Sequence, residues 1–367
     1  MNKTIRAIGA GFLVGIWLAL TAFAWFGPAQ ERSESERRDL AQMPDVTWDS
    51  ILDKTFMDRF EDYSLDQFPL RDRFRTVKAT FLYDVLQQTD NNGYFIKDGY
   101  IAKQTYPLSQ PSVNHALKCF NRIYDKYLAE SDCSVYLSVI PDKGYFLAQE
   151  NGYPSMDYRN LLAQLDANMP WAEYISVIEH LQIDDYYRTD THWKQEEILA
   201  VAQILCQQMG AEAPKAEDFT HEKLDKPFYG VYYGHAAMPM EAETITLLHS
   251  EVLDSCTVYD HETGKNIGIY NMEKLDGADP YEVYLSGTKA LLTIENPNAT
   301  TDKELILFRD SFGSSIAPLL VQGYKSVTLV DIRYVNLDFI GNFLTFENQD
   351  VLFLYSTLIL NESSTMK

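Results

Sequence analysis

The chain has 367 residues, with 53 acidic and 31 basic side chains and a formal net charge of −22. A chain this acidic is a poor nonspecific partner for nucleic acid or for anionic cell-wall polymers, because like charges repel. The simplest role of the charge is to keep an exported domain soluble. The length allows one large domain with insertions, or two domains.

The first predicted element is an apolar helix over residues 7–26, which contain no charged side chain. A helix needs roughly 20 apolar residues to cross a bilayer, so we expect a single-pass membrane anchor. Lys3 and Arg6 precede this segment and favour a cytoplasmic N-terminus with the remaining chain outside, although Arg32, Arg37 and Arg38 follow it and weaken the asymmetry. Residues 22–24 instead fit the cleavage site of a signal peptide, which would give a secreted protein. We favour the uncleaved anchor, because the apolar core is longer than that of a typical signal peptide.

After the anchor we expect a membrane-proximal helical segment over residues 31–90. Apolar periodicity predicts helices over 48–60 and 70–86, with a break at Phe68-Pro69. Residues 92–102 then predict a β-hairpin around a Lys-Asp-Gly turn.

Helices and strands alternate in the rest of the chain, apart from residues 215–297. This alternation predicts a mostly parallel sheet with helices on both faces, an α/β/α sandwich. The expected strands are 135–140, 174–178, 305–308, 326–330 and 351–354, and the expected helices are 112–128, 195–209, one reaching residue 321 and one from 337.

Residues 215–297 show short strands bounded by turns, such as 244–249 and 256–259. We interpret them as a β-rich insertion packed over the site. Its aromatic residues are either the core of a small sheet or part of the site: Phe228, Tyr229, Tyr232 and Tyr233. The expected organisation is therefore an anchor (1–30), a helical segment (31–90), a first part of the α/β domain (91–214), the insertion (215–297) and a second part (298–367).

Ser311 follows an apolar run and precedes small residues, in the sequence LILFRDSFGS at 305–314. This pattern predicts a strand, a tight turn that carries the serine, and a helix. The hydroxyl would lie at the carboxyl edge of the sheet near the positive end of a helix dipole, where a developing oxyanion is stabilised. Ser311 is thus a candidate nucleophile or a helix N-cap. Its backbone N–H is the oxyanion donor that the sequence suggests, and Asp310 is expected to hold the turn or cap the helix.

Asp190 and His192 lie two residues apart in the sequence YYRTDTHW at 186–193. In an extended chain this spacing places both side chains on the same face. A carboxylate beside a histidine can fix its tautomer and stabilise the imidazolium that forms when the ring takes a proton from a serine. A core histidine and a metal ligand are the alternatives for His192, but the other histidines have no HxH or HxxxH spacing. We therefore expect no metal and no cofactor.

With these two motifs the chain resembles the DHHW proteins and the related alginate O-acetylation proteins. Further agreeing stretches are residues 67–72, 92–100, 140–143 and 330–334. The resemblance implies an SGNH-hydrolase-like domain with a catalytic triad formed by Ser311, His192 and Asp190. Thr191 stands where the family usually has a first histidine, and on a strand this neighbour of the acid would point away from it. In simple SGNH hydrolases the serine comes first, whereas here it comes last, so the resemblance is to the acetyl-transferring branch.

Five residues are candidates for supporting the site or binding substrate. Asp310 and Lys143 lie near predicted strand ends, and Lys143 is either structural or part of the site. Arg333 either positions a sugar or charge or forms a salt bridge, and Tyr334 follows it. Trp193 either stacks on a sugar or packs under the histidine.

The expected function is that of an O-acetyltransferase anchored in the cell membrane, with an extracellular domain that acts on a cell-surface or secreted polysaccharide. The resemblance implies a partner, a multi-pass membrane-bound O-acyltransferase that supplies acetyl groups. An acetyl esterase with the same triad is one alternative, and a non-catalytic glycan-binding or scaffold protein of the envelope is the other. The cysteines are either paired or free: Cys119, Cys133, Cys206 and Cys256.

Overall fold

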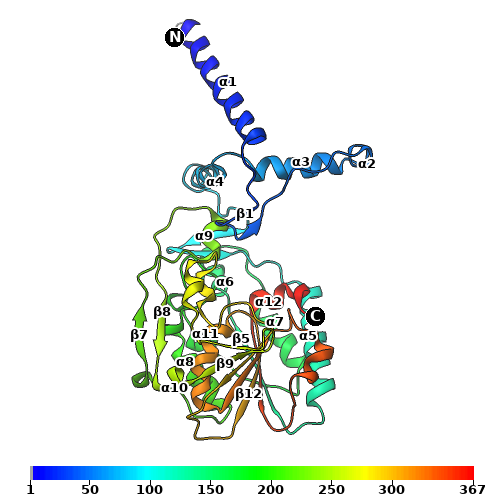
Figure 1. Ribbon diagram of the computed structural model, residues 1–367, viewed down its shortest axis with the longest axis vertical. Helices are drawn as coiled ribbons and strands as arrows, with labels where there is room; N and C mark the ends of the chain where they lie inside the picture. Colours follow the sequence, from blue (N-terminus) through cyan, green and yellow to red (C-terminus); the bar gives the residue numbers. More distant parts are fainter. Residues whose placement is uncertain (1–2) are drawn as a thin grey trace. The chain divides into compact units, whose positions relative to one another are not determined.

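A computed structural model of the chain describes residues 3–367 and divides them into two compact units (Figure 1). The first unit contains the chain up to residue 91 together with residues 233–239. The second contains residues 92–232 and 240–367.

The first unit is mainly helical. The helix predicted over residues 48–60 is divided in two at Asp53-Lys54, where Lys54 adopts a left-handed conformation, and its second part continues to Asp66. The helix predicted over 70–86 is confirmed, since residues 71–85 are helical. The helix α1 includes the stretch Thr4–Trp25, which is long and apolar enough to cross a membrane. Leu70 adopts a left-handed conformation just before α4, which places the helix break at the predicted Phe68-Pro69. The elements are α1 (Lys3–Phe26), β1 (Arg32–Ser33), β2 (Arg38–Asp39), α2 (Trp48–Leu52), α3 (Thr55–Asp66), α4 (Arg71–Thr80) and the π-helical η1 (Phe81–Val85).

The second unit is built on an eight-stranded sheet with the order β10-β9-β11-β13-β12-β14-β5-β6. The strands from β13 to β6 in this order are parallel, whereas β11, β9 and β10 are each antiparallel to their neighbours. The strands are β5 (Ser134–Ile140), β6 (Glu173–Tyr174), β9 (Thr257–Asp260), β10 (Lys265–Ile267), β11 (Leu291–Glu295), β12 (Glu304–Arg309), β13 (Ser326–Val330) and β14 (Asp350–Ser356).

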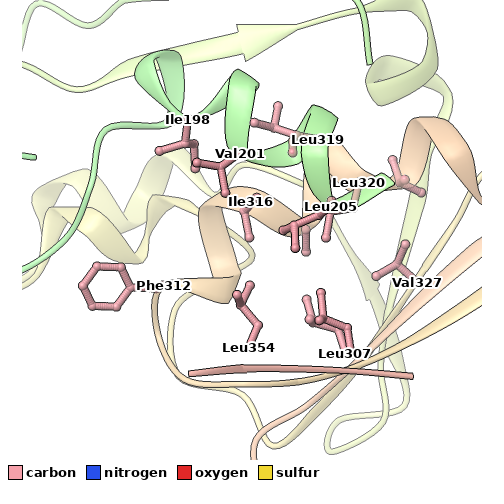
Figure 2. Packing of buried hydrophobic residues seen from close by; sticks show 14 of the residues in the cluster. Ile198, Val201, Leu205, Leu307, Phe312, Ile316, Leu319, Leu320, Val327 and Leu354 are labelled. Carbon is pink, nitrogen blue, oxygen red and sulfur yellow. The ribbon is translucent and has the colours of Figure 1, made fainter. Parts of the chain in front are cut away.

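Helices cover both faces of this sheet, which confirms the predicted α/β/α sandwich. Side chains alternate along β12, so Leu305 and Leu307 join the buried cluster with α8 (Leu199–Gln208) and α11 (Gly313–Leu320). Ile306 and Phe308 face the other cluster, with α5 (Gln110–Ile123), α7 (Tyr158–Asn168) and α12 (Thr357–Asn361). Figure 2 shows the first cluster, in which Val201 and Leu205 of α8 lie over Ile316 of α11.

The predicted hairpin is confirmed: β3 pairs with β4 in antiparallel orientation, and the hairpin packs on the short helix α6 (Lys143–Leu147). The hairpin strands are β3 (Tyr94–Lys97) and β4 (Tyr100–Lys103). The four cysteines are free thiols, so the unpaired alternative is the one that the structure shows.

Residues 215–297, which we expected to form a separate insertion, are divided between a small sheet and the main sheet. The strands β7 (Thr220–Lys223) and β8 (Thr246–His249) form a small sheet of their own, but β9, β10 and β11 extend the main sheet. Phe228 and Tyr232 are buried, whereas Tyr229 is exposed, and Tyr233 belongs to the first unit. The segment also contains the short helices α9 (Val231–Ala236) and α10 (Glu251–Ser255).

The strand order locates the edge at which a ligand would bind. If β12 is taken as the first strand, followed by β13, β14, β5 and β6, the parallel strands have the spatial order 2-1-3-4-5 of flavodoxin-like sheets. In such sheets ligands bind beyond the carboxyl ends of the first and third strands, where the chain connections diverge. Here those strands are β12 and β14, and Ser311 directly follows β12.

Candidate active site

Ser311 lies in the turn between β12 and α11 and is partly exposed, as the sequence predicts. The buried carboxylate of Asp310 holds this turn: its Oδ1 accepts the Phe312 N–H at 3.0 Å and its Oδ2 accepts the Ser356 N–H at 2.8 Å. The second bond ties the end of β12 to the end of β14. Gly313 is needed because a Cβ there would lie 2.6 Å from the Cβ of Arg309.

Ser311, His192 and Asp190 form a continuous hydrogen-bonded chain. The Ser311 Oγ lies 2.8 Å from His192 Nε2, and His192 Nδ1 lies 2.6 Å from Asp190 Oδ1. Asp190 is fully buried and His192 nearly so. This is the arrangement in which an imidazole can take a proton from serine while a carboxylate orients the ring.

The Asp190 side chain is held on both oxygens. Its Oδ1 also accepts the His192 N–H at 3.0 Å, and its Oδ2 accepts the Val231 N–H at 2.8 Å. The chain of Gly230 runs so close to Asp190 that a Cβ at Gly230 would lie 2.2 Å from the Asp190 Cβ.

The expectation of an extended chain at Asp190 and His192 is wrong. These residues lie in a bend enclosed by an isolated bridge between Tyr186 and Trp193. The carboxylate's bond to the His192 N–H closes a local turn, and this turn brings the two side chains together. Thr191, at the position of the missing histidine, shares a hydrogen bond of 2.9 Å with the Tyr232 hydroxyl.

Aromatic rings enclose the His192 imidazole. The ring of Tyr281 stacks on it with a centroid distance of 3.8 Å and an interplanar angle of 4°, and Phe312 approaches at 4.9 Å in a tilted arrangement. The Tyr281 hydroxyl donates to Ser315 Oγ at 2.8 Å. Burial raises the pKa of Tyr281 well above its usual value, so this hydroxyl stays protonated.

Trp193 is completely buried, and its Nε1 also donates to Ser315 Oγ, at 2.8 Å. It packs edge-on against Phe312 with centroids 5.4 Å apart. The indole therefore offers no face for a sugar, and the structure shows the packing alternative instead.

Two buried charges fix the backbone just before Asp190. Lys143 Nζ donates to the carbonyl oxygens of Tyr187 at 2.9 Å and Arg188 at 3.1 Å. Glu243 accepts the N–H groups of Arg188 and Thr189, both at 2.8 Å. Burial lowers the pKa of Lys143 to about 7, although nearby carboxylates oppose this shift. The contacts of Lys143 are therefore with the backbone that precedes Asp190.

Arg333 forms the salt bridge that the sequence left as one of two alternatives. Its Nε and Nη2 donate to the two oxygens of buried Asp331, at 2.9 and 2.6 Å. Its guanidinium lies 5.4 Å from the ring centre of Tyr334, which is half exposed. The fully buried Arg309 approaches the same carboxylate at 3.5 Å.

The sequence analysis did not identify three residues of the site: Tyr281, Glu243 and Gly230. All come from residues 215–297, where no short motif marks them, and they reach the triad only through tertiary packing. Among residues 3–367, no group of three or more His, Cys, Asp or Glu side chains is arranged to hold a metal ion.

Comparison with known proteins confirms the resemblance found in the sequence. The family profile described as "DHHW protein" matches residues 166–330, which include Asp190, His192 and Ser311. No curated protein sequence matches the chain.

Two solved structures share the fold. A DHHW family protein from Eubacterium siraeum has a TM-score of 0.61 and 21% identity, over 74% of this chain and 93% of that one. Bacillus cereus PatB1 has a TM-score of 0.57 and 18% identity, over 73% of this chain and 96% of its own. PatB1 has also been solved with a sulfonyl adduct.

Proposed function

We propose that the protein is an extracellular, membrane-anchored O-acetyltransferase that acetylates a cell-surface or secreted polysaccharide. The observation that carries this proposal is the hydrogen-bonded chain from Ser311 through His192 to Asp190, with distances of 2.8 and 2.6 Å. The resemblance to alginate O-acetylation proteins supports acetyl as the transferred group and a sugar hydroxyl as the acceptor.

The first half-reaction forms an acetyl-enzyme. Ser311 Oγ attacks the carbonyl carbon of the acetyl donor while His192 Nε2 takes the hydroxyl proton. The carbonyl oxygen becomes an oxyanion beside the Ser311 N–H at the start of α11, where the helix dipole stabilises negative charge. The tetrahedral intermediate then collapses, the donor's leaving oxygen takes the proton from His192, and Ser311 keeps the acetyl group as an ester.

The second half-reaction returns the enzyme to its starting state. His192 Nε2 takes the proton of an acceptor hydroxyl, whose oxygen attacks the acetyl carbonyl carbon. The bond to Ser311 Oγ breaks, and this oxygen regains the proton from His192. Asp190 stabilises the imidazolium in both halves. A sugar hydroxyl as acceptor gives transfer, and water gives the esterase alternative.

The location of the protein and the source of the acetyl group are parts of the same proposal. The span Thr4–Trp25 supports one membrane crossing, and Lys3 and Arg6 favour a cytoplasmic N-terminus. A multi-pass membrane-bound O-acyltransferase would then deliver acetyl groups across the bilayer to Ser311.

The first test asks whether Ser311 is an activated nucleophile. The purified full-length chain is treated with phenylmethanesulfonyl fluoride, a probe suggested by the sulfonyl adduct of PatB1. We expect one sulfonyl group on the Ser311 peptide and loss of aryl acetate hydrolysis. Ser311→Ala and His192→Ala should abolish hydrolysis at an unchanged melting temperature, whereas the exposed Ser134→Ala should react like the parent protein.

Wild-type turnover in a folded Ser311→Ala or His192→Ala variant would contradict the triad. A folded parent protein that neither reacts with the sulfonyl fluoride nor hydrolyses the ester would favour the non-catalytic alternative. Transfer is distinguished from hydrolysis by offering oligosaccharide acceptors with the aryl acetate. Acetylated sugar in the mass spectrum supports the transferase, and acetate alone supports the esterase.

A further inference from the structure

An apolar stripe runs along the exposed side of α4 and η1 in the first unit. Its members are spaced at helical intervals and have side chains that are between 46% and 65% exposed: Leu70, Phe74, Val77, Phe81 and Val85. Steps of three and four residues keep successive side chains on one helical face. Five large apolar side chains aligned in this way indicate a surface that is normally covered. We call these five residues the α4 stripe.

The opposite side of the same helix is anchored in its own unit. Ala79, halfway round the helix from the stripe, is completely buried. Arg75 forms an ion pair with Glu36 at 3.1 Å and donates to the carbonyl oxygen of Gly234 at 2.9 Å. Arg71 pairs with the same glutamate. Because this polar face is fixed, the α4 stripe is held facing outward and cannot rotate inward.

The stripe begins beside the end of the candidate membrane span. Gln30, four positions after α1 ends, forms two hydrogen bonds with Gln67. The backbone N–H of Gln30 donates to Gln67 Oε1 at 2.8 Å, and Gln67 Nε2 donates to the backbone carbonyl oxygen of Gln30 at 2.9 Å. Phe23 of α1 and Leu70 of the stripe line one cavity. The first residue of the stripe therefore lies where the chain leaves the apolar helix.

The charges around the stripe suit a lipid headgroup region. Residues 71–86 carry four basic side chains, of which Arg71 and Arg75 pair with Glu36 on the opposite face and Arg73 and Lys78 do not. Arg73 and Lys78 are exposed and flank the stripe on its two sides. An apolar stripe flanked by basic residues is typical of helices that lie in the membrane interface.

We propose that the α4 stripe lies in the lipid interface, so that α4 and η1 form a second membrane contact beside the α1 anchor. This inference rests on the membrane anchoring in the proposed function. The occupant is lipid because the stripe continues from the end of the span and is bordered by cations. With two contacts the first unit is held at a fixed depth and orientation at the bilayer surface.

The test maps lipid contacts on the full-length chain. One chain is reconstituted per nanodisc of phosphatidylcholine and phosphatidylglycerol containing a diazirine-bearing phospholipid, irradiated, digested and analysed by mass spectrometry. We expect lipid adducts on peptides from α1 and from residues 70–85. The exposed Phe339 and Phe343 of the second unit serve as an internal control and should remain unlabelled.

Two matched variants make the result specific. The double change Val77→Asp and Phe81→Asp should lower labelling of residues 70–85 several-fold while α1 stays labelled, whereas Phe343→Asp should leave both unchanged. Unlabelled residues 70–85 beside a labelled α1 would overturn the proposal and assign the stripe to a protein partner or a second copy. An unlabelled α1 would instead overturn the membrane anchoring, and with it the premise of this inference.

Discussion

The imidazole of His192 and the ring of Tyr281 lie parallel, with centroids 3.8 Å apart and planes inclined by 4°. Tyr281 is in turn tied to Ser315 on α11, the helix that follows Ser311. Tyr281 therefore connects the ring of the candidate base His192 with the helix that follows the candidate nucleophile Ser311. A shift of either would change the distance between His192 and Ser311.

Tyr281→Leu should lower the turnover of an aryl acetate, because the imidazole loses the flat surface that limits its rotation. Aromatic pairs contribute about 0.5–1.5 kcal/mol beyond their buried area, which corresponds to roughly a tenfold loss at most. Tyr281→Phe keeps the stack and loses only the bond to Ser315, so its effect on turnover should be smaller. Steady-state kinetics with melting curves test this order, and equal losses in both variants would show that the hydroxyl matters more than the stack.

Asp190→Asn and Asp310→Asn should differ in their effect on turnover, although both carboxylates are buried near Ser311. Each carboxylate accepts two backbone N–H groups, so an amide that places its NH₂ group against one of them should cost about 1–3 kcal/mol of unfolding free energy in either variant. Only Asp190 contacts the His192 ring, so Asp190→Asn should also lower turnover on the order of 10³- to 10⁴-fold. The turnover of folded Asp310→Asn should fall much less. If Asp310→Asn gave the larger loss of turnover, Asp310 would be the orienting acid.

Gly230→Ala should reduce activity without a direct contact to substrate. The new Cβ would lie 2.2 Å from the Asp190 Cβ and 2.4 Å from its backbone nitrogen, so one of the two chains must move. A displacement of about 1 Å in a catalytic group lowers rates on the order of 10²-fold. A crystal structure of the variant should show Asp190 displaced from His192, and normal turnover would mean that the loop moves without disturbing the acid.

Lys143 should make stability depend on pH between about 7 and its usual pKa. Its folded pKa is lowered to about 7 by burial, while Asp190, Glu243 and Asp142 oppose the shift. Between the folded and unfolded pKa values the unfolded chain binds more protons, so the contribution of Lys143 to stability rises with pH. Lys143→Met removes this pH-dependent contribution to the unfolding free energy. The unfolding free energy of the parent protein, measured relative to that of the variant, should therefore increase from pH 6 to about 9. A difference that stays constant over this range would contradict the shifted pKa.

The topology of the proposed anchor can be tested in cells whose wall has been removed. Added protease should degrade the folded units and leave a short fragment that contains α1. A fully protected chain would place it in the cytoplasm and exclude an extracellular glycan as substrate. A released protein that begins just after Ala24 would mean a cleaved signal peptide and would also remove the premise of the lipid contact by α4.

Local patterns in the sequence predicted the centre of the fold well. The strand at 326–330 matches β13, and the Asp310-Ser311 turn between β12 and α11 follows from an apolar run that ends in small residues. These features depend on neighbours in the chain. The pairing of β11 with β13 and β9, and the approach of Gly230 to Asp190, depend on residues far apart. No local periodicity encodes such contacts, which is why residues 215–297 appeared to be a separate insertion.

Trp193 and the bend at Asp190 show a second limit. An aromatic residue next to a candidate catalytic histidine fits a sugar-binding surface and a core equally well, and only its burial decides between them. The spacing of Asp190 and His192 correctly predicted that their side chains are in contact, but the predicted extended backbone was wrong. A short carboxylate side chain can reach the ring two residues away in a turn as well as on a strand.

The strand order also bears on when the candidate triad can assemble. The strand β5 pairs with β14, which begins only at Asp350, and Ser311 stands 119 positions after His192 in the chain. If the domain is exported as proposed, His192 emerges from the membrane well before Ser311, and β14 can pair with β5 only after nearly the whole chain has emerged. Long-range pairing of this kind is slow to form. Under the proposed function a partly translocated chain would therefore carry no assembled triad, and acetyl transfer would begin only when the whole domain is outside.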